Sequence, residues 1–142
     1  MATIDDLAPP TEQAIGAEHY LTDGRRVVLR VTCCRRCDRR WFPARAQCSH
    51  CASFDVDDDV TSSRGTAYAS TVVRIGPAKF GPPYTLAYVD IDGVRVLAHV
   101  AAAPGALTPG TPVELQQAII GTDEDGPLLS YAVAVATDGE KS

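Results

Sequence analysis

The chain has 142 residues, of which 45% are hydrophobic and 22% are charged, and a net charge of −5, which is the composition of an ordinary soluble protein with one domain or two small ones. It has no apolar run near the ~18 residues that span a membrane, and its N-terminus lacks the basic and apolar regions of a signal peptide. We therefore expect no membrane partner and a cytoplasmic location, where cysteines are held by a metal rather than oxidised.

The charges are distributed unevenly along the chain. Residues 1–24 hold five acids and no bases, residues 25–45 hold eight arginines and one aspartate, and residues 46–142 hold twelve acids and five bases. We call residues 25–45 the basic island. Such a region can attract nucleic acid, nucleotide phosphates or an acidic partner surface, or its arginines can simply be solvated.

The first predicted element is an N-terminal helical arm over residues 1–24. Pro10-Thr11-Glu12 could begin a short helix, and Asp23-Gly24 would end it. The apolar residues between them follow no regular helical stripe, so the arm is expected to be short and to dock on the rest of the chain.

Residues 25–60 are predicted to form a zinc ribbon. Arg26–Thr32 is rich in branched residues and is expected to be a strand. It leads into a CxxC turn, a ten-residue spacer and a second CxxC turn, which can bring four sulfurs into the tetrahedral arrangement that zinc prefers. The spacer is long enough for two short strands. The predicted metal ligands are Cys34, Cys37, Cys48 and Cys51.

Four thiolates would leave no coordination position for water or substrate, so the predicted Zn²⁺ is structural. Two alternatives stay open, namely iron in a rubredoxin-like site, and cysteines that are unliganded or joined in disulfides. Cys33 has the wrong spacing for a ligand and is expected to be a spare thiol.

The rest of the ribbon carries weaker signals. Arg39–Phe42 is expected to be a second strand, with Trp41 and Phe42 packed near the metal. The acidic segment 55–60 is interpreted as a solvated turn, because no EF-hand spacing follows it. Thr61–Gly65 has the composition of a linker.

Residues 61–142 are predicted to form an OB-fold domain. The dipeptide Asp92-Gly93 between two strand patterns indicates a tight hairpin, because both central residues of a type I′ turn need positive φ. Five short strands without a convincing helix fit a five-stranded OB-fold barrel, and the fold class is mainly β. The expected strands are 66–75, 84–91, 94–100, 112–120 and 128–135.

Three features together resemble the domain-of-unknown-function thirty-five family. They are the four-cysteine ribbon, the strand that begins at Gly65-Thr66, and the unit Pro83–Leu97 with its acidic-glycine turn. In that family a rubredoxin-like zinc ribbon precedes an OB-fold, and the resemblance covers about residues 12–135. The family often has glycine after the second cysteine of each turn, where positive φ is favoured, whereas this chain has Asp38 and Ala52.

The resemblance implies a role beside thiolase-fold enzymes. Members are associated with acyl-CoA thiolases, with synthases that make branched acyl-CoA, and with lipid-transfer-protein-like aldolases that shorten sterol side chains in steroid degradation. The partner supplies the catalytic residues, while the ribbon-barrel subunit supports assembly and helps hold coenzyme A. A heterotetramer on a dimeric thiolase-like core is implied as well. We therefore expect an accessory subunit that is not catalytic alone.

Two sets of residues are candidates for this role. Lys79 and Phe80 lie in a Gly/Pro-rich loop, with Arg74 upstream, and could hold the phosphates and pantetheine arm of acyl-CoA or coenzyme A. The alternative is a loop used only for subunit contact. The second set, expected to bind the partner because arginine is enriched at interfaces, is Arg39, Arg40 and Trp41.

We expect no catalytic set in the chain. It has no GxSxG elbow and no phosphate loop, and its three histidines, His19, His50 and His99, stand in separate sequence contexts. The alternative function is a single-stranded nucleic-acid-binding module, because zinc ribbons and OB-folds both bind single strands. The acidic barrel region argues against it, so nucleic acid is not the expected partner.

Overall fold

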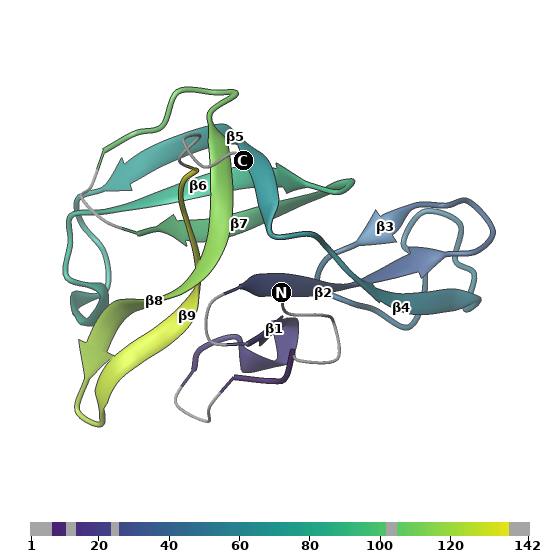
Figure 1. Ribbon diagram of the computed structural model, residues 1–142, viewed down its shortest axis with the longest axis horizontal. Helices are drawn as coiled ribbons and strands as arrows, with labels where there is room; N and C mark the ends of the chain where they lie inside the picture. Colours follow the sequence, from purple (N-terminus) through teal and green to yellow (C-terminus); the bar gives the residue numbers. More distant parts are fainter. Residues whose placement is uncertain (1–6, 11–13, 24–25, 102–104, 137–142) are drawn as a thin grey trace.

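The computed structural model describes residues 7–10, 14–23, 26–101 and 105–136 (Figure 1). Its fold is mainly β, as predicted, with a barrel at one end and a small cysteine-bearing sheet at the other. Within these residues no helix has the length and hydropathy to cross a membrane. In chain order the elements are η2 Ala17–His19, β1 Tyr20–Thr22, β2 Val27–Cys34, β3 Arg40–Trp41, β4 Val56–Val60, β5 Arg64–Val73, η3 Ala78–Phe80, β6 Tyr84–Ile91, β7 Val94–Val100, β8 Pro112–Asp123 and β9 Gly126–Val135.

The last five strands form a closed barrel in the order β5-β6-β7-β9-β8, which confirms the predicted five-stranded barrel. The pairing of β7 with β9 is parallel, and the other neighbouring strands are antiparallel. Side chains alternate between the interior and the exterior along β6 and β7, as on β7, where Val94, Val96 and Ala98 are buried. Closure gives every barrel strand a paired neighbour on each side, but the β7–β9 pairing covers only His99 and Val100 and the β5–β8 pairing only Arg64, Gly65 and Thr66.

The hairpin predicted at Asp92-Gly93 is confirmed. Both residues have positive φ, 46° at Asp92 and 90° at Gly93, and Ile91 pairs with Val94 on either side of the turn. The Asp92 side chain accepts a hydrogen bond of 2.6 Å from the Ser62 amide, so the tip of this hairpin contacts the segment that enters the barrel.

The smaller sheet is built around β2, which pairs with β1, β3 and β4. The expected solvated turn over residues 55–60 is wrong, because Val56–Val60 is a strand that pairs antiparallel with β2 over five residues. Aspartate is depleted in strands, but among the described strands β4 pairs with β2 alone, and charged side chains are well tolerated on such an edge. Composition alone therefore concealed this strand.

The predicted N-terminal helix is also wrong. Gly16 has a left-handed φ of 71°, a single 3-10 turn follows it, and the chain then becomes the strand β1. The Ile15 amide donates to the Leu129 carbonyl at 2.7 Å, which lays this segment along β9. Tyr20 is completely buried in an extended conformation, and a helix could not place it there while pairing with β2. Residues 11–13, where the helix was expected to begin, lie outside the described residues.

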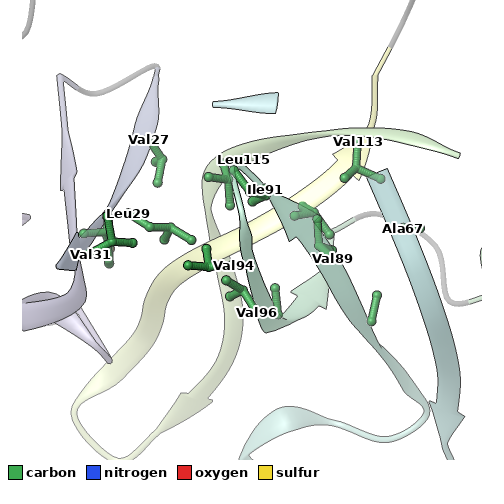
Figure 2. Close-up of a cluster of buried hydrophobic side chains, with 14 residues drawn as sticks. Val27, Leu29, Val31, Ala67, Val89, Ile91, Val94, Val96, Val113 and Leu115 are labelled. Atoms are coloured by element: carbon green, nitrogen blue, oxygen red, sulfur yellow. The ribbon is translucent and has the colours of Figure 1, made fainter. Parts of the chain in front are cut away.

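One hydrophobic core joins the small sheet to the barrel (Figure 2). Val27, Leu29 and Val31 of β2 are buried in the same cluster as the barrel residues Val96 and Leu115. Burial of each of these side chains contributes about 1.5–3 kcal/mol to the free energy of folding, so the contact between the small sheet and the barrel stabilises the fold. The strand that carries the first cysteines is thus anchored in the barrel core.

The segment predicted to be a linker has two buried, hydrogen-bonded residues, Thr61 and Ser63. Thr61 Oγ1 accepts a hydrogen bond of 3.0 Å from the Leu29 amide, and the Thr61 amide donates to the Leu29 carbonyl at 3.0 Å. Ser63 Oγ donates to the Val27 carbonyl at 2.8 Å. These bonds satisfy buried backbone groups of β2 and fix the connection. The division of the chain near residue 60 into two domains stays a prediction.

Candidate metal centre

The four predicted cysteines converge at the outer end of the small sheet. Their Sγ atoms all lie within 4.8 Å of one another, and the Cys34–Cys51 and Cys37–Cys48 sulfur pairs are each 3.6 Å apart. These distances are far beyond the ~2.05 Å of a disulfide. They are close to the ~3.8 Å that separates sulfurs around a tetrahedral metal with Zn–S bonds of about 2.3 Å.

The two CxxC turns, which we call the knuckles, have the same backbone structure. In each, the residue after the second cysteine has φ of 64°, at Asp38 and at Ala52, as expected from the turn. Each knuckle also makes the same two backbone hydrogen bonds, which turn the chain back on itself. They are Asp38 N to Cys34 O and Cys34 N to Arg39 O in the first, and Ala52 N to Cys48 O and Cys48 N to Ser53 O in the second, all 2.9 Å.

Backbone N–H groups point at the Cys48 sulfur. The amides of His50 and Cys51 lie 3.4 Å and 3.5 Å from Cys48 Sγ. Burial raises the pKa of Cys48, but these donors, with the Trp41 indole and the Cys37 thiol, lower it to about 6. Trp41 Nε1 is buried and has no partner of ordinary hydrogen-bond geometry in the described structure. Donors around a sulfur stabilise a thiolate, which is the form that binds metal.

The same arrangement keeps the four thiols from ionising together. The Arg39 amide lowers the pKa of Cys37, but burial and the adjacent thiol groups of Cys48, Cys34 and Cys51 raise it to about 12. Neighbouring negative charges at these distances repel one another, so a cation is needed before all four sulfurs can be thiolates. The donor set, spacing and charge balance fit a thiolate-bound metal such as zinc.

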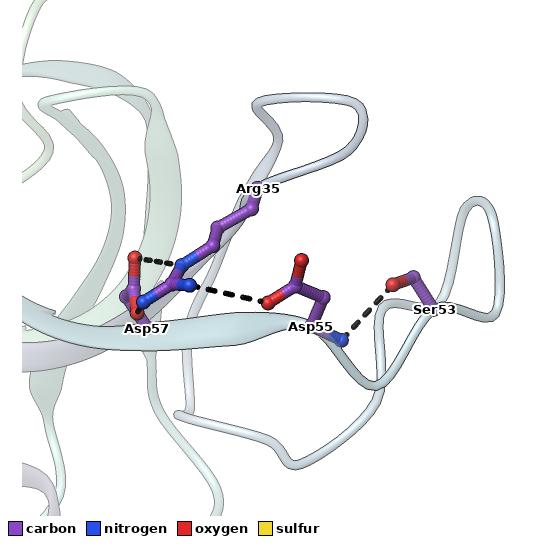
Figure 3. Close-up of polar contacts among 4 residues, drawn as sticks. All are labelled: Arg35, Ser53, Asp55 and Asp57. Carbon is purple, nitrogen blue, oxygen red and sulfur yellow. Dashed lines mark hydrogen bonds and ion pairs between the residues drawn. The ribbon is translucent and has the colours of Figure 1, made fainter.

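The basic island is partly neutralised by the acidic strand β4 (Figure 3). Arg35, between the two cysteines of the first knuckle, donates from Nε and a terminal nitrogen to Asp57 at 2.7 Å and 2.6 Å, and lies 3.5 Å from Asp55. The hydrogen bonds from Arg35 hold the pKa of the Asp57 carboxyl below its usual value. The Asp55 amide in turn donates to Ser53 Oγ at 2.9 Å. Carboxylates that follow the basic island in the sequence therefore balance part of its positive charge in the folded chain.

The predicted partner-binding residues differ in how far they are available. Arg39 is exposed, whereas Arg40 is half-buried, lies 3.4 Å from Asp59 and donates to the Val60 carbonyl at 3.4 Å. Trp41 is half-buried as well, and Arg45 stacks 5.2 Å above its ring. Their role at an interface stays a prediction.

Of the predicted acyl-CoA residues, Phe80 alone is among the described residues that line a cleft of about 400 Å³ between the N-terminal segment and the barrel. Phe80 is part of the cleft wall, and the Lys79 ammonium lies 5.3 Å from the Phe80 ring centre. Arg74 is exposed at the end of β5 and is not among the described residues that line the cleft. The wall includes Ile15, His19, Leu97, His99 and Tyr131.

This cleft brings together two histidines that the sequence analysis had kept apart. His99 packs against the rings of Phe80 and Tyr84, with centroid distances of 5.0 Å and 5.3 Å, and burial lowers its pKa. His19 lies on the opposite segment, 3.4 Å from Glu18. No local pattern could have revealed a cleft lined by residues 80 positions apart in the sequence. His50, in the second knuckle, is exposed.

Comparisons with known proteins find similarity to a protein family, to a curated protein and to a solved structure. Residues 60–117 match the protein family described as the C-terminal OB-fold domain of ChsH2. A curated relative is the benzoylsuccinyl-CoA thiolase subunit BbsA of Geobacter metallireducens, 29% identical over 111 residues, which are 77% of this chain and 75% of the relative. A chain of the solved Ltp2-ChsH2(DUF35) aldolase is similar with TM-score 0.60 and 28% identity, over 77% of this chain and 85% of that one. The predicted family resemblance is confirmed.

The left-handed residues of the knuckles give a testable prediction. The left-handed backbone conformation costs a residue with a Cβ about 1–2 kcal/mol, whereas glycine adopts it without this cost. Ala52→Gly should therefore stabilise the metal-loaded protein by about 1 kcal/mol, or tighten zinc binding about fivefold in competition with a chelator. Ala46→Gly, at an exposed position of the same loop without positive φ, is the control and should bring no gain. Equal effects of the two substitutions would contradict this account of the second knuckle.

Proposed function

We propose that this chain, which resembles the domain-of-unknown-function thirty-five family, is a zinc-containing, non-catalytic subunit of a thiolase-fold acyl-CoA enzyme. The observation that carries the proposal is the similarity over 77% of the chain to proteins named as a thiolase subunit and as the Ltp2-ChsH2(DUF35) aldolase. The partner is a thiolase or a lipid-transfer-protein-like aldolase, and its substrate is a sterol side-chain acyl-CoA or another acyl-CoA. The two proteins form a heterotetramer.

The chemistry of the metal centre supports a role in assembly. Zinc bound by Cys34, Cys37, Cys48 and Cys51 would have its tetrahedral coordination filled by sulfur, so the metal would hold the knuckles together and activate no water. Folding of the ribbon is then coupled to metal binding. In this proposal the catalytic residues belong to the partner enzyme.

The cleft beside η3 is proposed to hold part of the acyl-CoA. Its wall offers apolar and aromatic surface for the pantetheine arm, and the exposed ammonium of Lys79 at its rim is a counter-ion for phosphate. The Phe80 ring is part of the cleft wall and also lies next to the Lys79 ammonium. Arg74 stands farther from this wall and is proposed to contact the nucleotide end alone.

Purification of the tagged chain from its native cell tests the proposed function. We expect a thiolase-fold protein to co-elute in a stoichiometric ratio, because the chain is proposed to be an obligate part of that enzyme. Mass spectrometry identifies the co-eluting protein, and light scattering gives the stoichiometry. Elution of the chain alone, or with a partner of an unrelated fold, would show the proposal to be wrong.

Titration of the purified complex with an acyl-CoA tests the proposed ligand site. We expect Lys79→Ala combined with Phe80→Ala to weaken binding about tenfold or more, since both a phosphate counter-ion and an apolar wall are lost. Arg64→Ala combined with Phe54→Ala removes an exposed cation and an exposed aromatic ring elsewhere and serves as the control. Unchanged affinity in the first variant would leave the loop a structural element only.

A further inference from the structure

The outer face of the β6–β7 hairpin is unusually apolar for the solvent side of a barrel. Outward side chains of antiparallel strands are commonly polar, because only the inward face is buried. Here the outward cross-strand pairs are Tyr88 with Leu97, Leu86 with His99 and the charged pair Asp90 with Arg95, and Tyr68 of β5 lies beside them. Tyr68 is 51% exposed, Tyr88 47% and Leu97 46%.

The two charged residues on this face, Asp90 and Arg95, hold each other in place before any partner binds. The Arg95 guanidinium lies 3.4 Å from the centre of the Tyr68 ring and hydrogen-bonds the Asp90 carboxylate at 2.7 Å and 3.1 Å. Tyr68 stands at a β-bulge of β5, which turns its side chain toward β6 and β7. Tyrosine and arginine are the residues most enriched in binding hot spots, and fixed side chains lose less entropy on association. We call Tyr68, Tyr88, Arg95 and Leu97 the tyrosine face.

The barrel topology limits what can bind there. Strand β6 pairs with β5 along one edge and with β7 along the other, so an added peptide strand cannot join the strand that carries Tyr88. Strand β7 pairs with β9 only at His99 and Val100, but Tyr88 and Leu97 point outward from the sheet, so an occupant of this face packs against side chains. A contiguous apolar patch of this kind marks an interaction site, whereas the exposed side chains of Phe54 and Ile75 stand singly on other segments.

Charge decides between a protein and a nucleic acid as the occupant. Asp90 neutralises Arg95, and Asp92 stands at the tip of the same hairpin, so the tyrosine face carries no net positive charge. Phosphate backbones are bound by unpaired lysines and arginines, and the tyrosines alone would not supply that attraction. An uncharged, apolar protein surface fits the face better.

The tyrosine face is also continuous with the cleft proposed to hold acyl-CoA. Leu97 belongs to both, and His99, the next outward residue of β7, lines the cleft. A protein seated on Tyr88 and Leu97 would thus stand at the mouth of the cleft. This position suits an enzyme that must receive the reactive end of a ligand held there.

We propose that the tyrosine face is the surface on which the thiolase-fold partner docks. The inference rests on the proposed function, and it assigns the main contact to the barrel rather than to the arginines of the ribbon. An apolar patch of the partner covers Tyr88 and Leu97, and backbone or side-chain acceptors of the partner meet the outward nitrogens of Arg95.

Binding of the co-purified thiolase-fold partner to variants of the chain tests this inference. Tyr88→Asp combined with Leu97→Asp buries two charges in the proposed interface and should weaken binding at least 100-fold. Phe54→Asp combined with Ile75→Asp makes the same change at two more exposed positions and should bind like wild type. Circular dichroism and metal content show whether each variant folds, and Tyr88→Ser with Leu97→Ser replaces the aspartate pair if it does not.

A measurement on the unmodified complex complements the variants. Hydroxyl-radical footprinting should show protection of Tyr68 and Tyr88 when the partner is bound, and no change at Phe54. Wild-type affinity of the Tyr88 and Leu97 variant, together with unprotected tyrosines, would overturn the docking surface while leaving the proposed function intact. A wild-type chain that binds no thiolase-fold protein would overturn both. A homodimer that this substitution dissociates, or salt-dependent oligonucleotide binding lost in Tyr68→Ala, would assign the face to another occupant.

Discussion

The structure depends on the strand β2, which belongs to the metal centre and to the barrel core at once. Its last residue, Cys34, is one of the four clustered cysteines, while Val27, Leu29 and Val31 are buried against the barrel. The sulfur cluster is therefore attached to the barrel through a packed strand rather than through a flexible linker. Four sulfurs this close repel one another as thiolates, so a cation at their centre would stabilise the end of a strand whose other end is held by packing.

This arrangement separates the end of the molecule that carries the cysteines from the end that carries the two surfaces proposed to bind. The knuckles, the Arg35–Asp57 pair and the buried connection at Thr61 and Ser63 keep the small sheet in place. The cleft and the tyrosine face both lie on the barrel and share Leu97. A subunit that positions a ligand for another enzyme needs such a rigid support more than it needs reactive groups of its own.

Local patterns in the sequence predicted the features whose cause is local. The two CxxC turns predicted the knuckles, and Asp92-Gly93 predicted the hairpin, because spacing and backbone conformation suffice for both. The helical arm and the turn at 55–60 were wrong, because tertiary pairing with β2 overrides propensity. The cleft could not be predicted, since its wall combines residues far apart in the sequence, such as His19 and His99. Likewise, only the register places Tyr68, Tyr88 and Leu97 together.

The metal content of freshly purified, reduced protein tests the central claim most directly. We predict one zinc per chain in the wild type and its loss in Cys37→Ser. Zinc should be retained in Cys33→Ser, because Cys33 stands next to Cys34 in β2 but is not one of the four clustered cysteines. The zinc-free variant should also lose cooperative unfolding of the small sheet. Wild-type protein with neither zinc nor iron, or equal metal loss in both variants, would contradict the account.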